Sequence, residues 1–102
     1  MDIVSDGHIL MLHGDFDVRS TFAVRTAIYE RLELHEADLV IDMTDVSTID
    51  VTALRLLAVA TRHAWLTGHH LTVRNPGPAV RRMAHLAHLA HAIEVERVAA
   101  TA

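Results

Sequence analysis

The sequence predicts an α/β protein whose mixed, mostly parallel β-sheet is packed with helices, in the order β-β-α-β-α-β-α-β. Short apolar runs of strand length alternate with longer segments in which apolar residues recur at helical spacing. The first two strand-like runs are separated only by a short turn signal, which favours a hairpin. Strands that alternate with helices imply parallel crossovers, so a hairpin followed by crossovers gives a mixed sheet.

Length and composition indicate one compact domain over residues 1–102. Of the 102 residues, 51% are apolar and 22% are charged, which suits a packed core and argues against disorder. The formal net charge of -4 argues against nucleic acid or an anionic membrane as a partner. No apolar run approaches the ~20 residues of a transmembrane helix. Without a recognisable secretory signal, a cytoplasmic location is expected.

The first third of the chain contains two predicted strands and a helix. Residues 2–4 and 8–13 are the strands, and the turn between them contains Gly7. Residues 14–21 are expected to form a loop, in which Asp17, Ser20 or Thr21 can cap the following helix. That helix is predicted over residues 22–34. The apolar stripe expected to face the core consists of Phe22, Ala23, Ala27, Ile28, Leu32 and Leu34.

The centre of the chain predicts a strand, a polar loop and a helix. An apolar run over residues 37–42 is the strand, and residues 43–49 are expected to be the loop. Asp50 stands where a helix N-cap is expected, with a side chain that can accept from free backbone N–H groups. The helix then continues to about residue 65, and Thr52 falls in its first turn. Trp65 is expected to belong to the core.

The last third predicts a strand, a helix and an edge strand. Gly68 is a helix stop signal before the strand at residues 69–74. Residues 75–78 form the strongest break, and Pro78 suits the first position of the next helix. Residues 93–98 alternate apolar and charged side chains, as an edge strand does, and residues 99–102 are expected to be a loose tail.

Metal binding and catalysis both receive little support from the residues. His85, His88 and His91 are spaced by three, but on an ideal helix the outer two are about 240° apart and cannot easily share one ion. No Cys, Asp or Glu stands beside them at ligand spacing. There is no Gly-x-Ser-x-Gly motif and no Gly-rich phosphate loop. Arg81 and Arg82 favour a solvated helix face over an anion site.

Three segments together resemble a known family. Residues 14–17 are similar to a Gly-Glu-hydrophobic-Asp motif at the end of the second strand. Residues 45–54 are similar to Asp-hydrophobic-Ser/Thr-x-hydrophobic-Asp-Ser-Ser/Thr-Gly-Leu, and residues 75–83 to the proline-containing start of the third helix. Over nearly its whole length the chain therefore resembles a STAS domain, and within that superfamily the small bacterial anti-sigma factor antagonists.

The resemblance implies a regulatory binding protein in transcription and stress response, with no enzymatic activity, cofactor or metal. Its partner would be an anti-sigma factor that is also a GHKL-type serine kinase, and its binding would free the sigma factor. In the family, the kinase phosphorylates the Ser that follows the motif Asp, and binding is lost. The implied contact surface combines residues 14–19 with residues 47–55 at one end of the sheet. Its members would be Asp15, Asp17, Ser47, Thr48, Asp50, Val51, Thr52 and Arg55.

The chain departs from the family pattern at the phosphorylated position. Val51 follows Asp50 and has no hydroxyl, Ala53 replaces the motif Gly, and His88 stands where the family usually has Gly. Either Thr52 is a displaced phosphoacceptor, or the protein binds constitutively. The second is favoured, because moving from position 51 to 52 turns the side chain about 100° around the helix. One alternative is a scaffold subunit of a STAS assembly, which a stable homo-oligomer would favour. The other is a small-ligand-binding module that uses the same loops.

Overall fold

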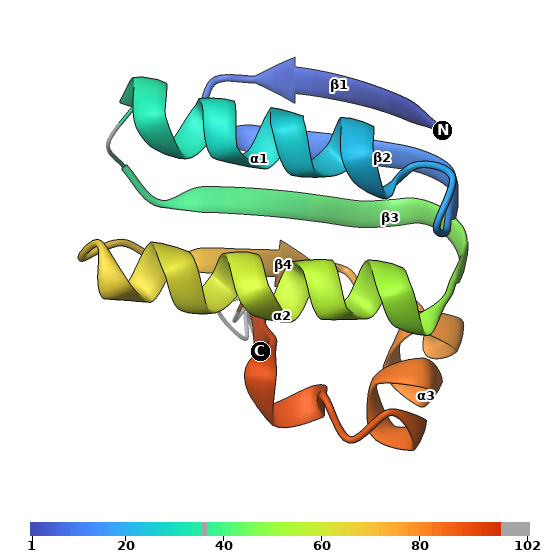
Figure 1. The fold of residues 1–102 in the computed structure, drawn as a ribbon. Helices are drawn as coiled ribbons and strands as arrows, with labels where there is room; N and C mark the ends of the chain where they lie inside the picture. Colours follow the sequence, from blue (N-terminus) through green and yellow to red (C-terminus); the bar gives the residue numbers. More distant parts are fainter. Residues whose placement is uncertain (36, 97–102) are drawn as a thin grey trace, which may run out of the picture.

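The computed structural model describes residues 1–35 and 37–96 and contains a five-stranded sheet and three α-helices (Figure 1). The strands lie in the order β1-β2-β3-β4-β5; β1 and β2 pair antiparallel and all other neighbours pair parallel. The predicted α/β class and order of elements are therefore confirmed. The element bounds are β1 Asp2–Asp6, β2 Ile9–Phe16, α1 Thr21–His35, β3 Leu39–Ile49, α2 Val51–Leu66, β4 Leu71–Arg74, α3 Pro78–Leu86, a 3-10 turn Ala90–Ala92 and β5 Glu94–Val95.

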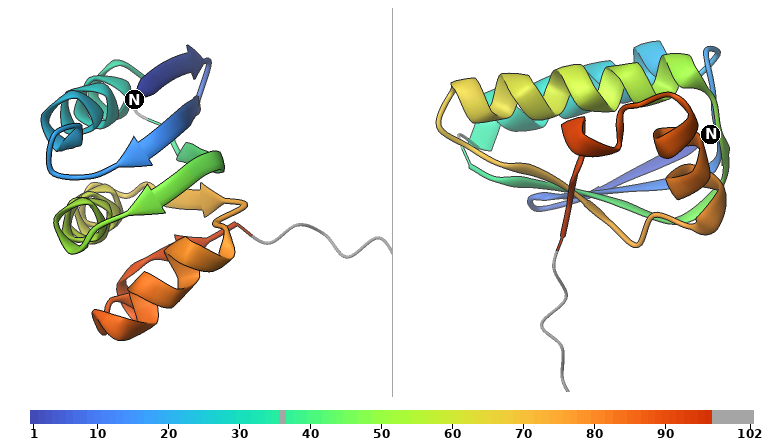
Figure 2. Two further views of the ribbon diagram at one scale, coloured as in Figure 1. Left: turned by 90° about the vertical axis from the view of Figure 1, so that its right-hand side faces the viewer. Right: turned by 90° about the horizontal axis from the view of Figure 1, so that it is seen from below.

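The sheet is covered by helices on one face. α1 and α2 run side by side against the same face, as both views in Figure 2 show. α3 lies near the N-terminal end of α2, past the end of β4 (Figure 1). Because parallel strands are connected through helices, the loops that follow β2 and β3 emerge at the same end of the sheet. This end carries most of the residues singled out in the sequence.

β3 is much longer than predicted. Residues 43–49 were expected to form a polar loop, but they continue the strand to Ile49. The pairing with β2 shifts register twice, between Met11 and His13 and between Gly14 and Asp15, with β3 supplying the extra residue each time. The buried side chains in this half of β3 are therefore three residues apart, at Met43, Val46 and Ile49. The bulges remove the period of two by which a strand is recognised.

β2 also extends beyond its predicted end. Gly14, Asp15 and Phe16 were placed in a loop, but they belong to the strand, which ends at a fully buried Phe16. Gly14 has φ +107° beside the second register shift, a backbone conformation that glycine adopts without strain. Only residues 17–20 remain as the connection to α1.

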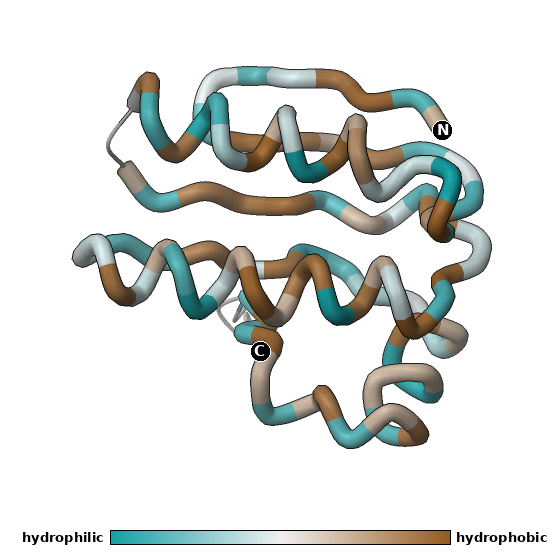
Figure 3. The backbone as a smooth tube through the Cα atoms, in the orientation of Figure 1, coloured by the Kyte–Doolittle hydropathy of each residue, from teal (hydrophilic) through white to brown (hydrophobic). Residues whose placement is uncertain are grey.

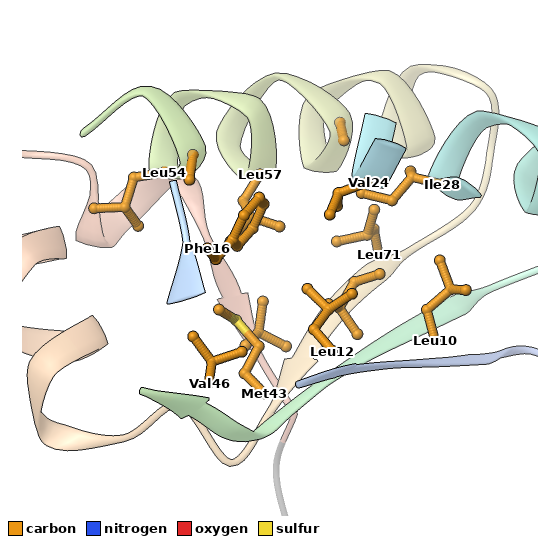
Figure 4. Packing of buried hydrophobic residues seen from close by; sticks show 14 of the residues in the cluster. Leu10, Leu12, Phe16, Val24, Ile28, Met43, Val46, Leu54, Leu57 and Leu71 are labelled. Carbon is orange, nitrogen blue, oxygen red and sulfur yellow. The ribbon is translucent and has the colours of Figure 1, made fainter. Parts of the chain in front are cut away.

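The core lies between the sheet and the pair of helices α1 and α2. In Figure 3 the first half of β3 is a continuous hydrophobic run, and its second half is paler and more hydrophilic. Figure 4 shows Leu12 of β2 and Met43 of β3 on the side of the sheet that faces Leu57 of α2. All three are at most 1% exposed. Burial of side chains of this size is the main favourable contribution to folding.

The predicted core is right at Ile28 and Leu32 but wrong at Phe22, Leu34 and Trp65. On α1 the buried side chains are Val24, Ile28 and Leu32, whereas Phe22 and Leu34 are 78% and 75% exposed. The helix is therefore rotated relative to the stripe expected from Phe22 and Ala23, because Val24 begins the i, i+4, i+8 row that faces the sheet. Trp65 was expected in the core but is 67% exposed, on the outer side of α2.

The C-terminal region differs from prediction in its details. β4 begins at Leu71, so His69 and His70 precede the strand, and α3 ends at Leu86, before His88 and His91. The spacing argument for an ideal helix over the three His residues therefore does not apply. Within the described part of the predicted edge strand, only Glu94–Val95 is assigned to β5. Residues 97 and 98 of that prediction, and the expected tail over residues 99–102, lie outside the described residues.

Candidate functional site

Asp50 joins the two segments that the sequence singled out. Its Oδ1 accepts from the backbone N–H of Ala53 at 2.8 Å, so it caps α2 as predicted. Its Oδ2 accepts from the backbone N–H of Val18 at 2.9 Å, from the connection between β2 and α1. The backbone N–H of Asp50 also donates to the carbonyl of Phe16 at 3.2 Å. One half-buried carboxylate thus fixes the connection between β2 and α1 against the start of α2.

Asp15 and Thr48 form a second link between these segments. They are paired in the parallel register of β2 and β3, and the Thr48 hydroxyl donates to Asp15 Oδ1 at 2.7 Å. Both side chains are exposed, as is Ser47 beside them. Together with Asp50, this bond gives the end of the sheet a set of oxygen acceptors on a backbone that is fixed by strand pairing.

Asp17 does not cap α1 through its side chain, although it was a candidate for that role. Its carboxylate instead accepts from Arg19, from the backbone N–H at 3.0 Å and from Nη2 at 2.8 Å. The side-chain hydrogen bond from Arg19 holds the pKa of Asp17 below its usual value, and the Arg19 backbone N–H adds to this effect. Ser20 accepts from the Asp17 N–H, which closes the turn before α1. Asp17 therefore shapes this turn, and Arg19 remains largely exposed.

The first turn of α2 presents a mixed surface. Val51 is the first residue of the helix and is half-buried, whereas Thr52 and Arg55 are exposed. The Thr52 hydroxyl lies near the positive end of a 16-residue helix, where a negative charge is favourable. The structure thus brings all the sequence-predicted site residues to one end of the sheet. Their acceptors, hydroxyls and one cation suit recognition of a partner surface.

The sequence analysis missed the contribution of α3 to this end of the molecule. An open depression of about 440 Å³ lies between the end of β3 and α3, lined among others by Thr48, Arg82 and Leu86. Leu86 is 68% exposed, and Val18 on the opposite side of the site is 62% exposed. The motif at residues 75–83 indicated the start of α3 but did not indicate which of its side chains face the site.

Within the described residues, no group of three or more His, Cys, Asp or Glu side chains is placed to hold a metal ion. The His side chains with ion-pair partners instead meet single acids, as His13 does with Asp45 and His70 with Glu94, each pair at 3.1 Å. None of the helices in the described part of the chain is long and apolar enough to cross a membrane.

Comparison with protein families gives one match, to the family model described as "Mlab, STAS domain", over residues 1–96. A search of curated proteins found no match. Solved structures with the same fold include a Thermotoga maritima protein that carries a provisional assignment as an anti-sigma factor antagonist. It has a TM-score of 0.76 and 13% identity, and the match covers 96% of this chain and 86% of that one.

Two further similar structures have related descriptions. An anti-sigma factor antagonist from Mycobacterium paratuberculosis has a TM-score of 0.70 and 25% identity, with 95% of this chain and 84% of that chain covered. The anti-sigma factor antagonist SpoIIAA, a Bacillus protein, in its unphosphorylated form has a TM-score of 0.72 and 15% identity, with coverage of 94% and 87%. These similarities span nearly the whole of the described chain.

Proposed function

This chain belongs to the STAS domain family, and from that premise we propose that it is a regulatory protein that binds an anti-sigma factor. The single observation that carries the proposal is the double role of Asp50, which fixes residues 17–20 against the start of α2. A partner surface needs a preorganised backbone, because ordering loops on binding reduces affinity. The relatives described as anti-sigma factor antagonists supply the kind of partner.

The proposed contact surface consists of residues 14–19 and 47–55, extended by Arg82 and Leu86 of α3. Exposed Asp15, Thr48 and Thr52 offer polar contacts, and Arg55 offers a cation. Exposed Val18 and Leu86 add apolar area on either side of these polar groups. A polar region combined with apolar anchors is the composition expected of a transient protein interface. The proposed partner is an anti-sigma factor of the GHKL serine kinase type, bound in the cytoplasm.

The binding is proposed to be constitutive. Val51 carries no hydroxyl at the position where the family resemblance implies phosphorylation, and its side chain is half-buried. Thr52 is exposed but is turned about 100° away around the helix from that position. A kinase that orients a hydroxyl at position 51 would therefore meet a methyl group in this protein.

The test is to mix the purified protein with each anti-sigma kinase of its own genome, with and without ATP. Native mass spectrometry measures the complex, and intact mass measures phosphate. We expect a complex that persists with ATP and carries no phosphate. Loss of the complex together with phosphate on Thr52 would replace constitutive binding by a displaced switch, and no complex with any kinase would overturn the proposal.

Val51 equally favours a second candidate function, that of a scaffold subunit in a STAS assembly. A subunit with a structural role has no need of a phosphoacceptor at position 51. Such a subunit would form a stable homo-oligomer or copurify with fixed stoichiometry in a larger complex, and light scattering of the purified protein distinguishes this from a monomer that binds kinases. Ligand-dependent shifts confined to residues 14–19 and 47–55 would instead favour a small-ligand-binding module.

A further inference from the structure

A cavity of about 140 Å³ lies between β4, α3 and the C-terminal segment, and none of the residues that line it belongs to the proposed interface. Its inner end is lined by Met43, Leu57, Val73 and Val80, which are all at most 4% exposed. Ala84 of α3 and Ala90 of the 3-10 turn also line it. This inner end offers only apolar side chains to an occupant.

The outer end of the cavity is cationic. Arg81 and His85 line it, and both side chains are exposed. They lie four residues apart on α3 and therefore on one side of the helix, next to the row of Val80 and Ala84 that faces inward. Arg81 Nε donates to the carbonyl of Pro76 at 3.1 Å, which fixes the position of the guanidinium group. Among the described residues that line the cavity there is no Asp or Glu.

We propose that this cavity is a binding site for a small carboxylic acid with a compact apolar body, an aryl or short branched alkyl group. An apolar cavity of about 150 Å³ accommodates benzene, so the size fits one ring or its aliphatic equivalent. The carboxylate then lies at the outer end, where a fixed guanidinium can donate two hydrogen bonds to it. Binding releases the apolar body from water without burying an unpaired charge.

The experiment uses benzoate as the probe and benzamide as its uncharged counterpart of nearly the same shape. Titration of each into the ¹⁵N-labelled full chain is followed by amide chemical shifts. We expect saturable shifts at Val73, Ala84 and Ile93, with benzoate binding at least tenfold more tightly than benzamide. The absence of saturable shifts at these residues for both probes would overturn the proposal.

Three variants locate the site. Ala84→Leu and Ala90→Leu add side-chain atoms to the cavity from two different elements, and each is expected to weaken benzoate binding more than tenfold. Ala23→Leu adds the same atoms at an exposed position of α1 and is expected to leave binding unchanged. Unchanged benzoate binding in both cavity-filling variants, with amide spectra that show an intact fold, would place the probe elsewhere and overturn the site.

A fourth variant tests the outer end. Arg81→Gln is expected to reduce the affinity for benzoate to that for benzamide, while benzamide binding stays the same. If the variant keeps the preference for benzoate, the assignment of the carboxylate to Arg81 is wrong. No residue of the proposed partner surface lines this cavity. A negative result with benzoate therefore does not contradict the proposed binding of an anti-sigma factor, and the absence of a kinase complex does not contradict the carboxylate site.

Discussion

Asp50 connects two segments that are 32 residues apart in the sequence, and its substitution is the first prediction. Asp50→Ala removes the cap on Ala53 N–H and the acceptor for Val18 N–H together. Loss of an N-cap costs about 1 kcal/mol, and loss of the second bond, to a charged acceptor, costs about as much again. We expect the free energy of unfolding, measured by urea denaturation, to fall by about 2 kcal/mol.

Asp50→Asn is the matched control for this prediction. The amide keeps one carbonyl oxygen for the Ala53 N–H, but its NH₂ group cannot accept from Val18. We therefore expect about half of the loss seen with Ala. A free energy of unfolding for Asp50→Ala within about 0.5 kcal/mol of the original, roughly the error of such measurements, would contradict the role assigned to this carboxylate.

The cap on α2 could be predicted at the residue scale, but the bond to Val18 could not. An Asp directly before a helical apolar pattern is a local signal, and the structure bears it out at Asp50. The same signal at Asp17 was misleading, because its carboxylate accepts hydrogen bonds from Arg19, two residues later, and does not cap α1. The contact between Asp50 and Val18 depends on how β2 and β3 pair, which no local pattern contains.

At the scale of elements, α2 and α3 end in the same way with different residues. In both, the second residue after the C-cap donates to a carbonyl inside the helix: His69 to Ala64 and Leu89 to Ala84, each at 2.9 Å. The residue between takes a positive φ, +85° at Gly68 and +57° at His88. This is the Schellman arrangement, which favours glycine at that position. His88 thus adopts a backbone conformation that is usually occupied by glycine.

The second prediction compares these two helix ends. Gly68→Ala is expected to lower the free energy of unfolding by about 1 kcal/mol, since an L-residue is strained there. A Cβ at Gly68 would meet no atom within 4 Å, so the change isolates the backbone effect. His88→Gly is expected to raise the free energy of unfolding by about 0.5 kcal/mol, the relief of strain being partly offset by the entropy of glycine.

Thermal or urea denaturation of both variants checks this pair, with His85→Gly as the control for a His inside α3. At position 85, in the last turn of α3, the same change should destabilise by about 0.4 kcal/mol, because glycine is less favourable than His in a helical conformation. A loss of stability in His88→Gly similar to that in His85→Gly would contradict the strain assigned to position 88.

The third prediction concerns the attachment of β5. His70 Nδ1 and Glu94 Oε2 are 3.1 Å apart, and the hydrogen bond that the protonated imidazole donates to Glu94 raises the pKa of His70 above its usual value. A raised pKa in the folded protein means that this pair stabilises fully below about pH 6.5, the pKa of an unfolded His. The contribution is then lost as the pH rises through the higher folded pKa. We expect the imidazole proton signals of His70 to titrate above pH 6.5 in NMR.

Glu94→Gln provides the comparison for His70. The amide keeps a hydrogen-bonding group but removes the charge that favours the imidazolium, so the midpoint of His70 should fall toward the unperturbed value. An unchanged titration midpoint of His70 in this variant would show that Glu94 does not raise the pKa of His70.

All five strands could be predicted, but the extent of β3 could not. The buried residues of its second half, Met43, Val46 and Ile49, follow a spacing of three, which arises from the two register shifts against β2. A pattern search for alternation sees polar residues 44, 45, 47 and 48 and predicts a loop. The buried side of α1 was also predicted incorrectly in part. Apolar residues occur on more than one side of this helix, so the sequence alone does not show that Val24 is buried and Phe22 is exposed.

At the scale of the whole molecule, the fold presents one continuous surface at the end of the sheet. The ends of β2 and β3, the first turn of α2 and part of α3 contribute to it, and the half-buried Val51 lies within the proposed contact surface. A change at that single residue should therefore alter the response of the whole protein to a kinase without disturbing its fold. Val51 is the first residue of a helix, a position that tolerates Ser.

The last prediction is that Val51→Ser converts the proposed constitutive binder into a phosphorylated switch. Phosphate adds close to two negative charges within the proposed interface, where repulsion and desolvation oppose binding. We expect the variant to gain one phosphate in the presence of the proposed anti-sigma kinase and ATP. Its affinity for that kinase should then fall at least tenfold. Val51→Ala should gain no phosphate and keep the complex, and Thr52→Ala in the original background should change neither. Phosphate on Thr52 of the original protein, or a Val51→Ser variant that stays unmodified by a kinase it binds, would contradict the role assigned to position 51.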